Sequence, residues 1–470
     1  MEGLIAQAHR RVQAADPRIL LAGIVLVALV LRLETLDSHL SDAEGYSYLV
    51  GSAPSPGAFL GRLAAYENTP PLFYLLLTPL PLDHTYWLRV PAVVPGVLIV
   101  AGLFIAMRRP FGTRAALLAA LAVAVAPYHV SYSDYSRGFM LAGLGEIIAL
   151  WAALRLVEKP RARWWILYGV GAVSAVYSEY DAAIFILALA LSLAGLQAGE
   201  QAWRSRLQPA VLGALPIAAL APWWPQIERG QDALNKTKIA PVFRDLSLSS
   251  LRDVTTRLTL GEHGTSARPA ARWFEFLAIA GVLVVVGVLV ARAIRRGPNR
   301  LPERGLRLVL GAAGLTLLAH IASPLFGRHI FNERYLTILI PLGAAATAVA
   351  FDRSPIRPLP ALFASLLATV GVAVFAQRFD KEYEPDLQPL RAAVASTHPR
   401  QVLTNSAVVL YYLRQLRPKL DRPFGLGPGE DAHCLRPCVI VDDTRDPGGA
   451  RAGPGQSGDL GPFRVRLAAG

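Results

Sequence analysis

The chain has 470 residues, of which 53% are hydrophobic and 17% are charged. A soluble domain averages about 25% charged residues, so this composition excludes an ordinary soluble core and indicates a polytopic membrane protein. The net charge is +13, but the basic residues lie in short clusters between apolar runs. Such clustering is typical of membrane topology and not of a nucleic-acid-binding surface, so we expect no nucleic acid partner.

The first apolar run covers residues 19–31, and Arg18 and Arg32 at its ends are placed to reach the membrane surface. No clear cleavage site follows it, so we interpret it as a membrane helix and not as a signal peptide. Further apolar runs follow at residues 87–107, 115–127, 139–157, 164–177, 182–196, 209–223, 274–293, 306–321, 335–351 and 358–376. Together they predict about eleven membrane helices, although several are shorter than the roughly 20 residues that a span needs.

Arginine and lysine cluster at every second connection between these runs, which places the N-terminus in the cytoplasm and the C-terminus outside the cell membrane. The short apolar stretch 70–80 is rich in proline, and we expect a helix that lies on the membrane or re-enters it. One connection, residues 224–272, is predicted to lie outside and yet is strongly basic. Its surplus positive charge marks it as a candidate functional segment.

Beyond residue 376 the composition becomes polar and rich in proline and glycine. Helices at 386–396 and 407–413 and strands at 401–404 and 438–442 predict a small α/β module outside the membrane. We therefore expect a membrane domain at 1–376 and an extracytoplasmic domain at 377–470. The spacing of Cys434 and Cys438 does not match a metal site, and both a disulfide and two free thiols fit it.

The loop between the first two spans, residues 37–86, carries Asp42 and Glu44 in S-D-A-E-G-Y-S-Y. Acidic side chains at a hydrocarbon boundary are costly, and they persist where a base, a cation site or an oriented polar pocket is needed. Ordinary solvated surface acids are the alternative. The sequence after Glu44 has no early proline, so we expect a short helix with Asp42 as its cap or in its first turn.

Five motifs share an order and spacing with a known family. They are S-D-A-E-G-Y-S-Y, N-T-P-P-L-F-Y-L-L-L, L-R-V-P-A-V, A-P-Y-H-V-S-Y-S-D-Y-S-R-G-F-M-L and E-R-Y-L-T-I-L-I-P. Over residues 19–376 the chain resembles bacterial membrane glycosyltransferases of the dolichyl-phosphate-mannose protein mannosyltransferase type. These include the aminoarabinose transferases and share the fold called GT-C. Relatives commonly have adjacent Asp-Glu where this chain has Ala43-Glu44, with Asp42 one residue earlier.

The resemblance implies transfer of a sugar from a polyprenyl-phosphate donor to a lipid, glycan or protein acceptor at the outer membrane surface. Asp42 is the predicted base and Glu44 the orienting acid, although the Ala43 departure leaves their roles open. The donor phosphate is assigned to Arg137, Arg328, His329 and Arg334, and the sugar or acceptor pocket to Tyr46, Tyr66 and Asn68. Each arginine taken singly also fits an interface anchor, and the tyrosines also fit an aromatic belt.

Three alternatives stay open. Glu146, in the middle of a predicted span, is either functional or an interhelical polar contact. A transporter also holds charges near the bilayer, but the chain has no visible internal repeat. An inactive relative that binds a glycolipid also fits the Ala43 departure. We expect no metal and no cofactor, because a donor with a single phosphate needs a divalent cation less than a nucleotide diphosphate does.

Overall fold

The protein is described here by a computed structural model. It describes residues 16–34, 36–37, 40–67, 69–197, 203–228, 247–260, 301–323, 331–354, 359–379, 401–404, 407–413, 438–443, 456–460 and 463–468, with single positions at 273–291 and 394. The chain forms two compact units. Unit 1 comprises Met1–Thr35, Asn68–Phe73 and Arg89–Asp380, and unit 2 comprises Leu36–Glu67, Tyr74–Leu88 and Lys381–Gly470.

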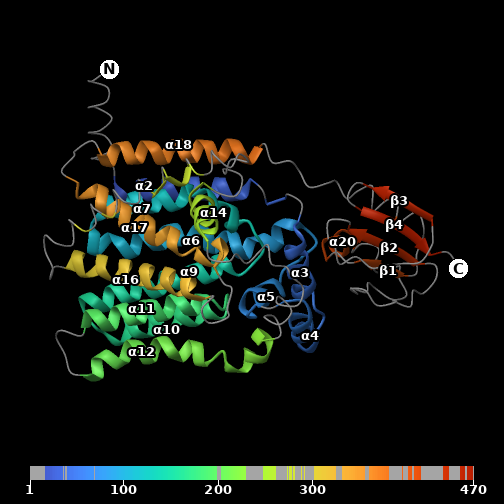
Figure 1. Ribbon diagram of the computed structural model, residues 1–470, viewed down its shortest axis with the longest axis horizontal. Coiled ribbons are helices and arrows are strands. Elements are labelled where there is room, and N and C mark those ends of the chain that lie inside the picture. Colours follow the sequence, from blue (N-terminus) through green and yellow to red (C-terminus); the bar gives the residue numbers. More distant parts are fainter. Residues whose placement is uncertain are drawn as a thin grey trace, which may run out of the picture. The chain divides into compact units, whose positions relative to one another are not determined.

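Unit 1 is a bundle of mostly apolar helices, most of which run alongside one another, whereas the polar α14 lies across their direction (Figure 1). Its helices are α2 (Pro17–Leu33), α7 (Thr113–Val125), α8 (Pro127–Ser133), α9 (Phe139–Glu158), α10 (Ala162–Val176), α11 (Ala182–Gln197), α12 (Trp203–Ala218), α14 (Leu248–Leu260), α16 (Leu301–Ala322), α17 (Leu339–Asp352) and α18 (Leu359–Phe379), together with most of α6 (Thr85–Phe111). Two 3-10 turns, η1 (Ala221–Trp223) and η3 (Glu333–Leu336), complete it. The short α5 (Leu72–Leu77) lies in the stretch predicted to lie on the membrane.

Three of the described helices, α6, α9 and α16, are long and apolar enough to cross a membrane. A fourth span is possible if α7 and α8 are one broken span, since they bend by 62° at Ala126. The described parts of α11, α17 and α18 are apolar but shorter. The predicted total of about eleven spans therefore stays a prediction, and residues 274–293 lie largely outside the described residues.

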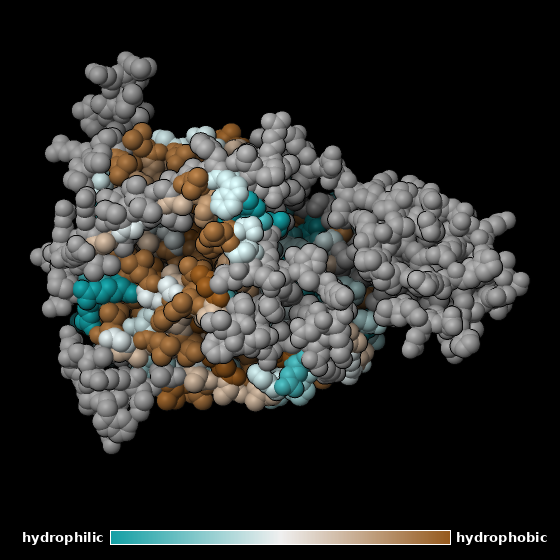
Figure 2. All heavy atoms as spheres, in the orientation of Figure 1, coloured by the Kyte–Doolittle hydropathy of each residue, from teal (hydrophilic) through white to brown (hydrophobic). Residues whose placement is uncertain are grey.

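Hydrophobic side chains cover much of the visible surface of unit 1, in brown in Figure 2. Leu26 on α2, Ile166 on α10, Leu318 on α16 and Val372 on α18 are 60%, 67%, 60% and 70% exposed. A soluble protein rarely exposes so many large apolar side chains together, whereas lipid tails solvate them well. The surface therefore agrees with a bundle that lies in a membrane.

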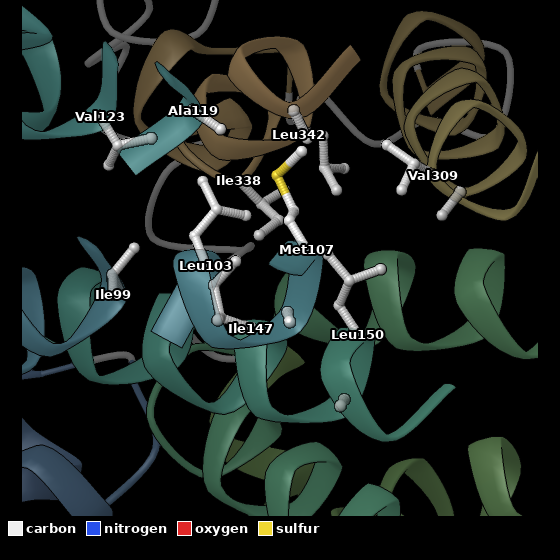
Figure 3. Packing of buried hydrophobic residues seen from close by; sticks show 14 of the residues in the cluster. Ile99, Leu103, Met107, Ala119, Val123, Ile147, Leu150, Val309, Ile338 and Leu342 are labelled. Carbon is white, nitrogen blue, oxygen red and sulfur yellow. The ribbon is translucent and has the colours of Figure 1, made fainter. Parts of the chain in front are cut away.

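The centre of unit 1 is packed by side chains from five helices (Figure 3). Leu103 and Met107 of α6 lie against Ile147 and Leu150 of α9, and all four are at most 1% exposed. Helices α9 and α10 approach most closely where Gly145 meets Gly171: a Cβ at Gly145 would lie 2.6 Å from the carbonyl oxygen of Gly171. Small residues allow this backbone contact, which is a common way for membrane helices to pack.

The sequence prediction that the Arg32 side chain reaches the membrane surface is wrong, because this side chain is fully buried. Its guanidinium donates to Ser133 Oγ at 2.9 Å, to the carbonyl oxygen of Ala124 at 3.1 Å and to His129 Nδ1 at 2.8 Å. Ala124 lies in the last turn of α7, where carbonyl groups lack helical partners. Arg32 therefore satisfies the carbonyl groups that the break between α7 and α8 leaves open.

Gly96 of α6 makes room for this network, because a Cβ there would overlap Ser133 Oγ and lie 3.4 Å from Arg32 Nε. Ser133 Oγ in turn donates to the carbonyl oxygen of His129 at 2.6 Å. These contacts join α2, α6, α7 and α8. Because α8 leads directly into the turn that carries Arg137, the network also fixes where that turn begins.

Unit 2 contains α3 (Asp42–Gly51), α4 (Pro56–Tyr66), α20 (Ala407–Tyr412) and a four-stranded sheet. The strands are β1 (Gln401–Thr404), β2 (Cys438–Asp443), β3 (Gln456–Leu460) and β4 (Phe463–Ala468), in the order β1-β2-β4-β3. β1 and β2 are parallel, with Val402 opposite Val439, and the other pairs are antiparallel. Parallel neighbours need a crossover connection, and α20 lies on it. Of the helix predicted at 386–396 the structure describes only Val394, which is helical and buried, and Cys434 lies outside the described residues.

Candidate functional site

The predicted acid pair lies on α3, which begins at Asp42 as the sequence predicts. Its N-cap is Ser41, whose hydroxyl accepts from the backbone N–H of Glu44 at 3.4 Å. Glu44 Oε2 accepts from the backbone N–H of Ser41 at 3.0 Å, which completes a capping box. The cap that the sequence offered as an alternative role for Asp42 therefore belongs to Ser41 and Glu44.

The two acids differ in their surroundings. Glu44 is 2% exposed, and its side chain is held by the cap. Asp42 is the first helical residue, and its side chain lies outside what the structure describes. Residues two apart on a helix diverge by about 200°, so positions 42 and 44 lie on different sides of α3.

Two of the predicted pocket residues meet in unit 2. The rings of Tyr46 on α3 and Tyr66 on α4 stack with centroids 6.3 Å apart. Arg62 Nη1 donates to the carbonyl oxygen of Leu49 at 2.7 Å and holds the two helices together. The tyrosine pair thus joins α3 to α4, and Tyr46 lies on the same helix as Asp42 and Glu44. Asn68, Arg328 and His329 lie outside the described residues.

α3 also packs on α20, which lies far along the chain. The backbone N–H of Leu40 donates to Tyr412 Oη at 3.2 Å, and the rings of Tyr48 and Tyr411 meet edge to face at 5.0 Å. Tyr411 is 1% exposed. The segment that carries the acids is therefore positioned by the C-terminal part of the chain.

In unit 1, three turns converge. They are the turn after α8 that carries Arg137, the turn between α10 and α11 at residues 177–181, and η3 with Arg334. A Cβ at Gly138 would overlap the carbonyl oxygen of Ser178, so the first two turns touch through their backbones. The rings of Phe139 and Tyr335 lie 6.4 Å apart and join η3 to the same place. We call this the three-turn cluster.

In the three-turn cluster, Arg137 and Arg334 both lie close enough to Tyr335 to act on it electrostatically. The carboxylates of Asp181 and Glu179 also act on Tyr335. Tyr128, Tyr132 and Tyr135 all interact electrostatically with Arg334. The buried Nε of Arg334 has no hydrogen-bond partner among the described residues. A partly buried guanidinium with an open donor among phenol groups is well suited to bind an anion.

Asp181 adds a titratable group to the cluster. Burial raises the pKa of Asp181 to about 7, against the lowering effects of a backbone hydrogen bond and of the nearby Arg334 guanidinium. Its charge therefore changes near neutral pH. Because the ionised carboxylate competes for positive charge, the cluster is most attractive to an anion when Asp181 is protonated.

Glu146 is buried in α9 at 5% exposure, and the Asp181 carboxylate acts on it electrostatically. For Glu146, a functional role and an interhelical polar contact therefore both stay predictions. Among the described residues, no group of three or more His, Cys, Asp or Glu side chains is arranged to hold a metal ion.

Sequence reasoning missed several members of the cluster. Glu179 and Asp181 lie two residues apart in a turn that the alternating basic connections predict to lie outside the membrane. This pair of acids is the feature of the sequence that could have indicated the cluster. Arg257, which forms an ion pair with Glu333 at 2.8 Å, lies in the basic connection 224–272. Nothing in the local pattern assigns it a partner.

Comparison with known proteins now adds to this geometry. Residues 69–225 match the family described as dolichyl-phosphate-mannose-protein mannosyltransferase. Two crystal structures of ArnT from Cupriavidus metallidurans are similar at 14% sequence identity over 91% of this chain and 93% of theirs. Their TM-scores are 0.53 for the form bound to undecaprenyl phosphate and 0.55 for the apo form. A search among curated proteins gives no match.

A third structure, the archaeal oligosaccharyltransferase AglB from Archaeoglobus fulgidus in complex with an inhibitory peptide and a dolichol-phosphate, is similar at 12% identity. It covers 91% of this chain and 69% of AglB, with a TM-score of 0.54. The resemblance to GT-C glycosyltransferases predicted from the sequence is confirmed. The chain shares its fold with ArnT and AglB.

Proposed function

We propose that the protein is a glycosyltransferase that moves a sugar from a polyprenyl-phosphate donor to a hydroxyl acceptor at the outer face of the cell membrane. The observation that carries the proposal is the three-turn cluster, in which Arg137 and Arg334 lie among tyrosines with an open guanidinium donor. Support also comes from ArnT, which has the same fold and was crystallised with undecaprenyl phosphate. The acceptor is a lipid, a glycan or a protein hydroxyl.

In the proposed reaction, the anomeric C–O bond to phosphate breaks and a bond from the acceptor oxygen to the anomeric carbon forms. Asp42 takes the proton of the acceptor hydroxyl as general base. Glu44, on the same helix α3, orients the sugar or the acceptor. The polyprenyl phosphate leaves with the bonding electron pair. Arg137 and Arg334 hold the leaving phosphate, whose charge grows as the bond breaks.

Arg137→Ala and Arg334→Ala are expected to weaken donor use about ten- to a hundredfold each, because a lost hydrogen bond to a charged group is worth about 1.5–3 kcal/mol. The measurement is product formation by the purified full chain with a panel of polyprenyl-phosphate sugars. Arg108→Ala, an exposed arginine at the far end of α6, is the control and should leave the rate unchanged. Parent rates in both Arg137→Ala and Arg334→Ala would show that these residues are only interface anchors.

We also propose about eleven spans, a cytoplasmic N-terminus and an extracytoplasmic α/β domain at residues 377–470. Support comes from the basic residues at every second connection between the apolar runs. A reporter that is active only outside the membrane, fused after Gly470, should be active. Activity from a cytoplasmic reporter at the same position would contradict the odd number of spans.

A further inference from the structure

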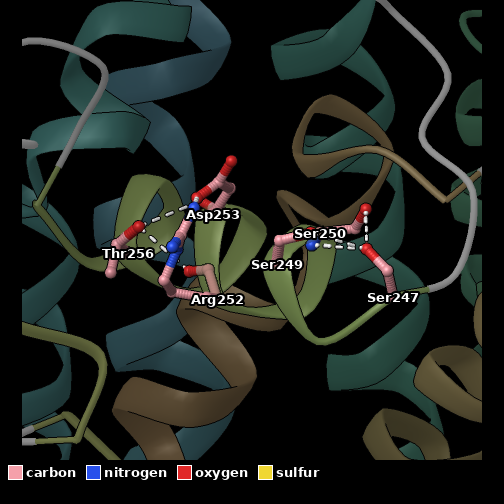
Figure 4. A network of polar contacts seen from close by, with 6 residues as sticks. All are labelled: Ser247, Ser249, Ser250, Arg252, Asp253 and Thr256. Carbon is pink, nitrogen blue, oxygen red and sulfur yellow. Dashed lines mark hydrogen bonds and ion pairs between the residues drawn. The ribbon is translucent and has the colours of Figure 1, made fainter. Parts of the chain in front are cut away.

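Helix α14 lies in the basic connection 224–272, whose charge has no assigned role. Ser247 Oγ accepts from the backbone N–H of Ser250 at 3.1 Å and begins the helix (Figure 4). Arg252 forms an ion pair with Asp253 at 2.7 Å and lies 4.9 Å above the ring of Trp273. These polar groups find their partners within or beside α14. They therefore account for the fold of the helix but not for a link to the site.

Arg257, near the end of α14, has a partner in η3. Its Nη1 donates to Glu333 Oε1 at 2.8 Å. The Glu333 side chain is 5% exposed, and that of Arg257 is 37% exposed. Arg257 therefore places a positive charge beside a largely buried carboxylate, and removal of one partner of such a pair is costly. Glu333 is also the residue directly before Arg334.

The rest of η3 is held by buried apolar contacts and by a cap. Phe331 and Leu336 are fully buried and pack on Val254 of α14. The side chain of Asn332 accepts the backbone N–H of Arg334 at 3.0 Å and caps the turn. Arg334 therefore has a backbone held by its cap and by buried neighbours. Its guanidinium keeps an open donor for a ligand.

We infer that Arg257 is a positioning residue for the donor phosphate, which it serves by holding the Glu333 carboxylate away from Arg334. This inference rests on the proposed phosphate role of Arg334. Without Arg257, the Glu333 carboxylate becomes an adjacent counter-charge for the Arg334 guanidinium, and the donor phosphate has to displace it. The basic connection therefore supplies a cation, Arg257, that contacts the Glu333 carboxylate and does not contact the substrate.

The test measures the dissociation constant of undecaprenyl phosphate for the purified full chain. Arg257→Gln should raise this constant about tenfold, as expected for one lost charged hydrogen bond. Arg257→Lys keeps the charge and should restore most of the affinity. Arg252→Gln removes the same charge from the same helix and should bind like the parent. The exchange of Arg257→Glu with Glu333→Arg should bind better than Arg257→Glu alone, because it rebuilds the pair and removes the carboxylate beside Arg334.

Each outcome separates this inference from the proposed function. If Arg334→Ala weakens binding but Arg257→Gln binds like the parent, positioning by Arg257 is wrong while the phosphate role of Arg334 stands. If Arg334→Ala itself binds like the parent, the phosphate role fails, and the inference fails with it. Should Arg257→Gln fold poorly, the exchange variant decides: equally weak binding by the exchange and by Arg257→Glu overturns the pairing mechanism.

Discussion

Replacing Asp42 by asparagine is expected to lower the turnover number by at least about 100-fold, because removal of a general base typically costs about 10²–10⁴ in rate. The substitution keeps the size of the side chain and removes its ability to take a proton. The capping box belongs to Ser41 and Glu44, so the melting temperature should stay close to that of the parent. Turnover is measured with the purified protein and its polyprenyl-phosphate sugar donor.

Two further variants make this result specific. Asp83→Asn applies the same change to an exposed acid in the same outer segment and should leave turnover unchanged. Glu44→Ala should lower stability by about 1 kcal/mol through loss of the cap. If Glu44→Ala abolishes turnover at normal stability while Asp42→Asn keeps it, the base is Glu44.

The second large effect is expected for Arg32→Met. Four interhelical hydrogen bonds disappear, and buried groups at Val123, Ala124, His129 and Ser133 lose their donor. Hydrogen bonds between membrane helices are worth about 0.6–1.7 kcal/mol each, so we expect a loss of roughly 2–4 kcal/mol in the free energy of unfolding. Arg32→Lys should recover little of it, because a single ammonium group lacks the planar fork that reaches several acceptors.

The control for Arg32 lies on the same helix. Arg18 is exposed near the start of α2, and Arg18→Met removes an equal charge without removing a buried contact. Thermal unfolding in lipid nanodiscs compares the two. A melting temperature of Arg32→Met equal to that of Arg18→Met would contradict the role of Arg32 at the α7–α8 break.

The sequence predicted the long apolar helices well. The run at residues 139–157 is α9 (Phe139–Glu158), and the run at 182–196 is α11 (Ala182–Gln197). Continuous apolar sequence between turn residues decides these elements, because the backbone must satisfy its own hydrogen bonds in a membrane. Local pattern and local physics agree there.

The burial of Arg32 could not be predicted from the local sequence. An arginine at the end of an apolar run usually extends to the membrane surface, and only the carbonyl groups at the α7–α8 break explain its burial. Helix α14 was not predicted either, because the polar segment gains its stability from contacts with η3. The spacing of Ser41 and Glu44 also matches a capping box. The sequence prediction instead assigned the Glu44 carboxylate to the reaction.

The packing of α3 on α20 has a consequence for biogenesis. The hydrogen bond from Leu40 to Tyr412 joins residues that are 372 positions apart. At about 5–20 residues per second, their synthesis is separated by roughly 20–75 s. During that interval the acid-bearing helix is already made but lacks its partner. A nascent chain is therefore expected to hold α3 without its packing partner until α20 has been synthesised.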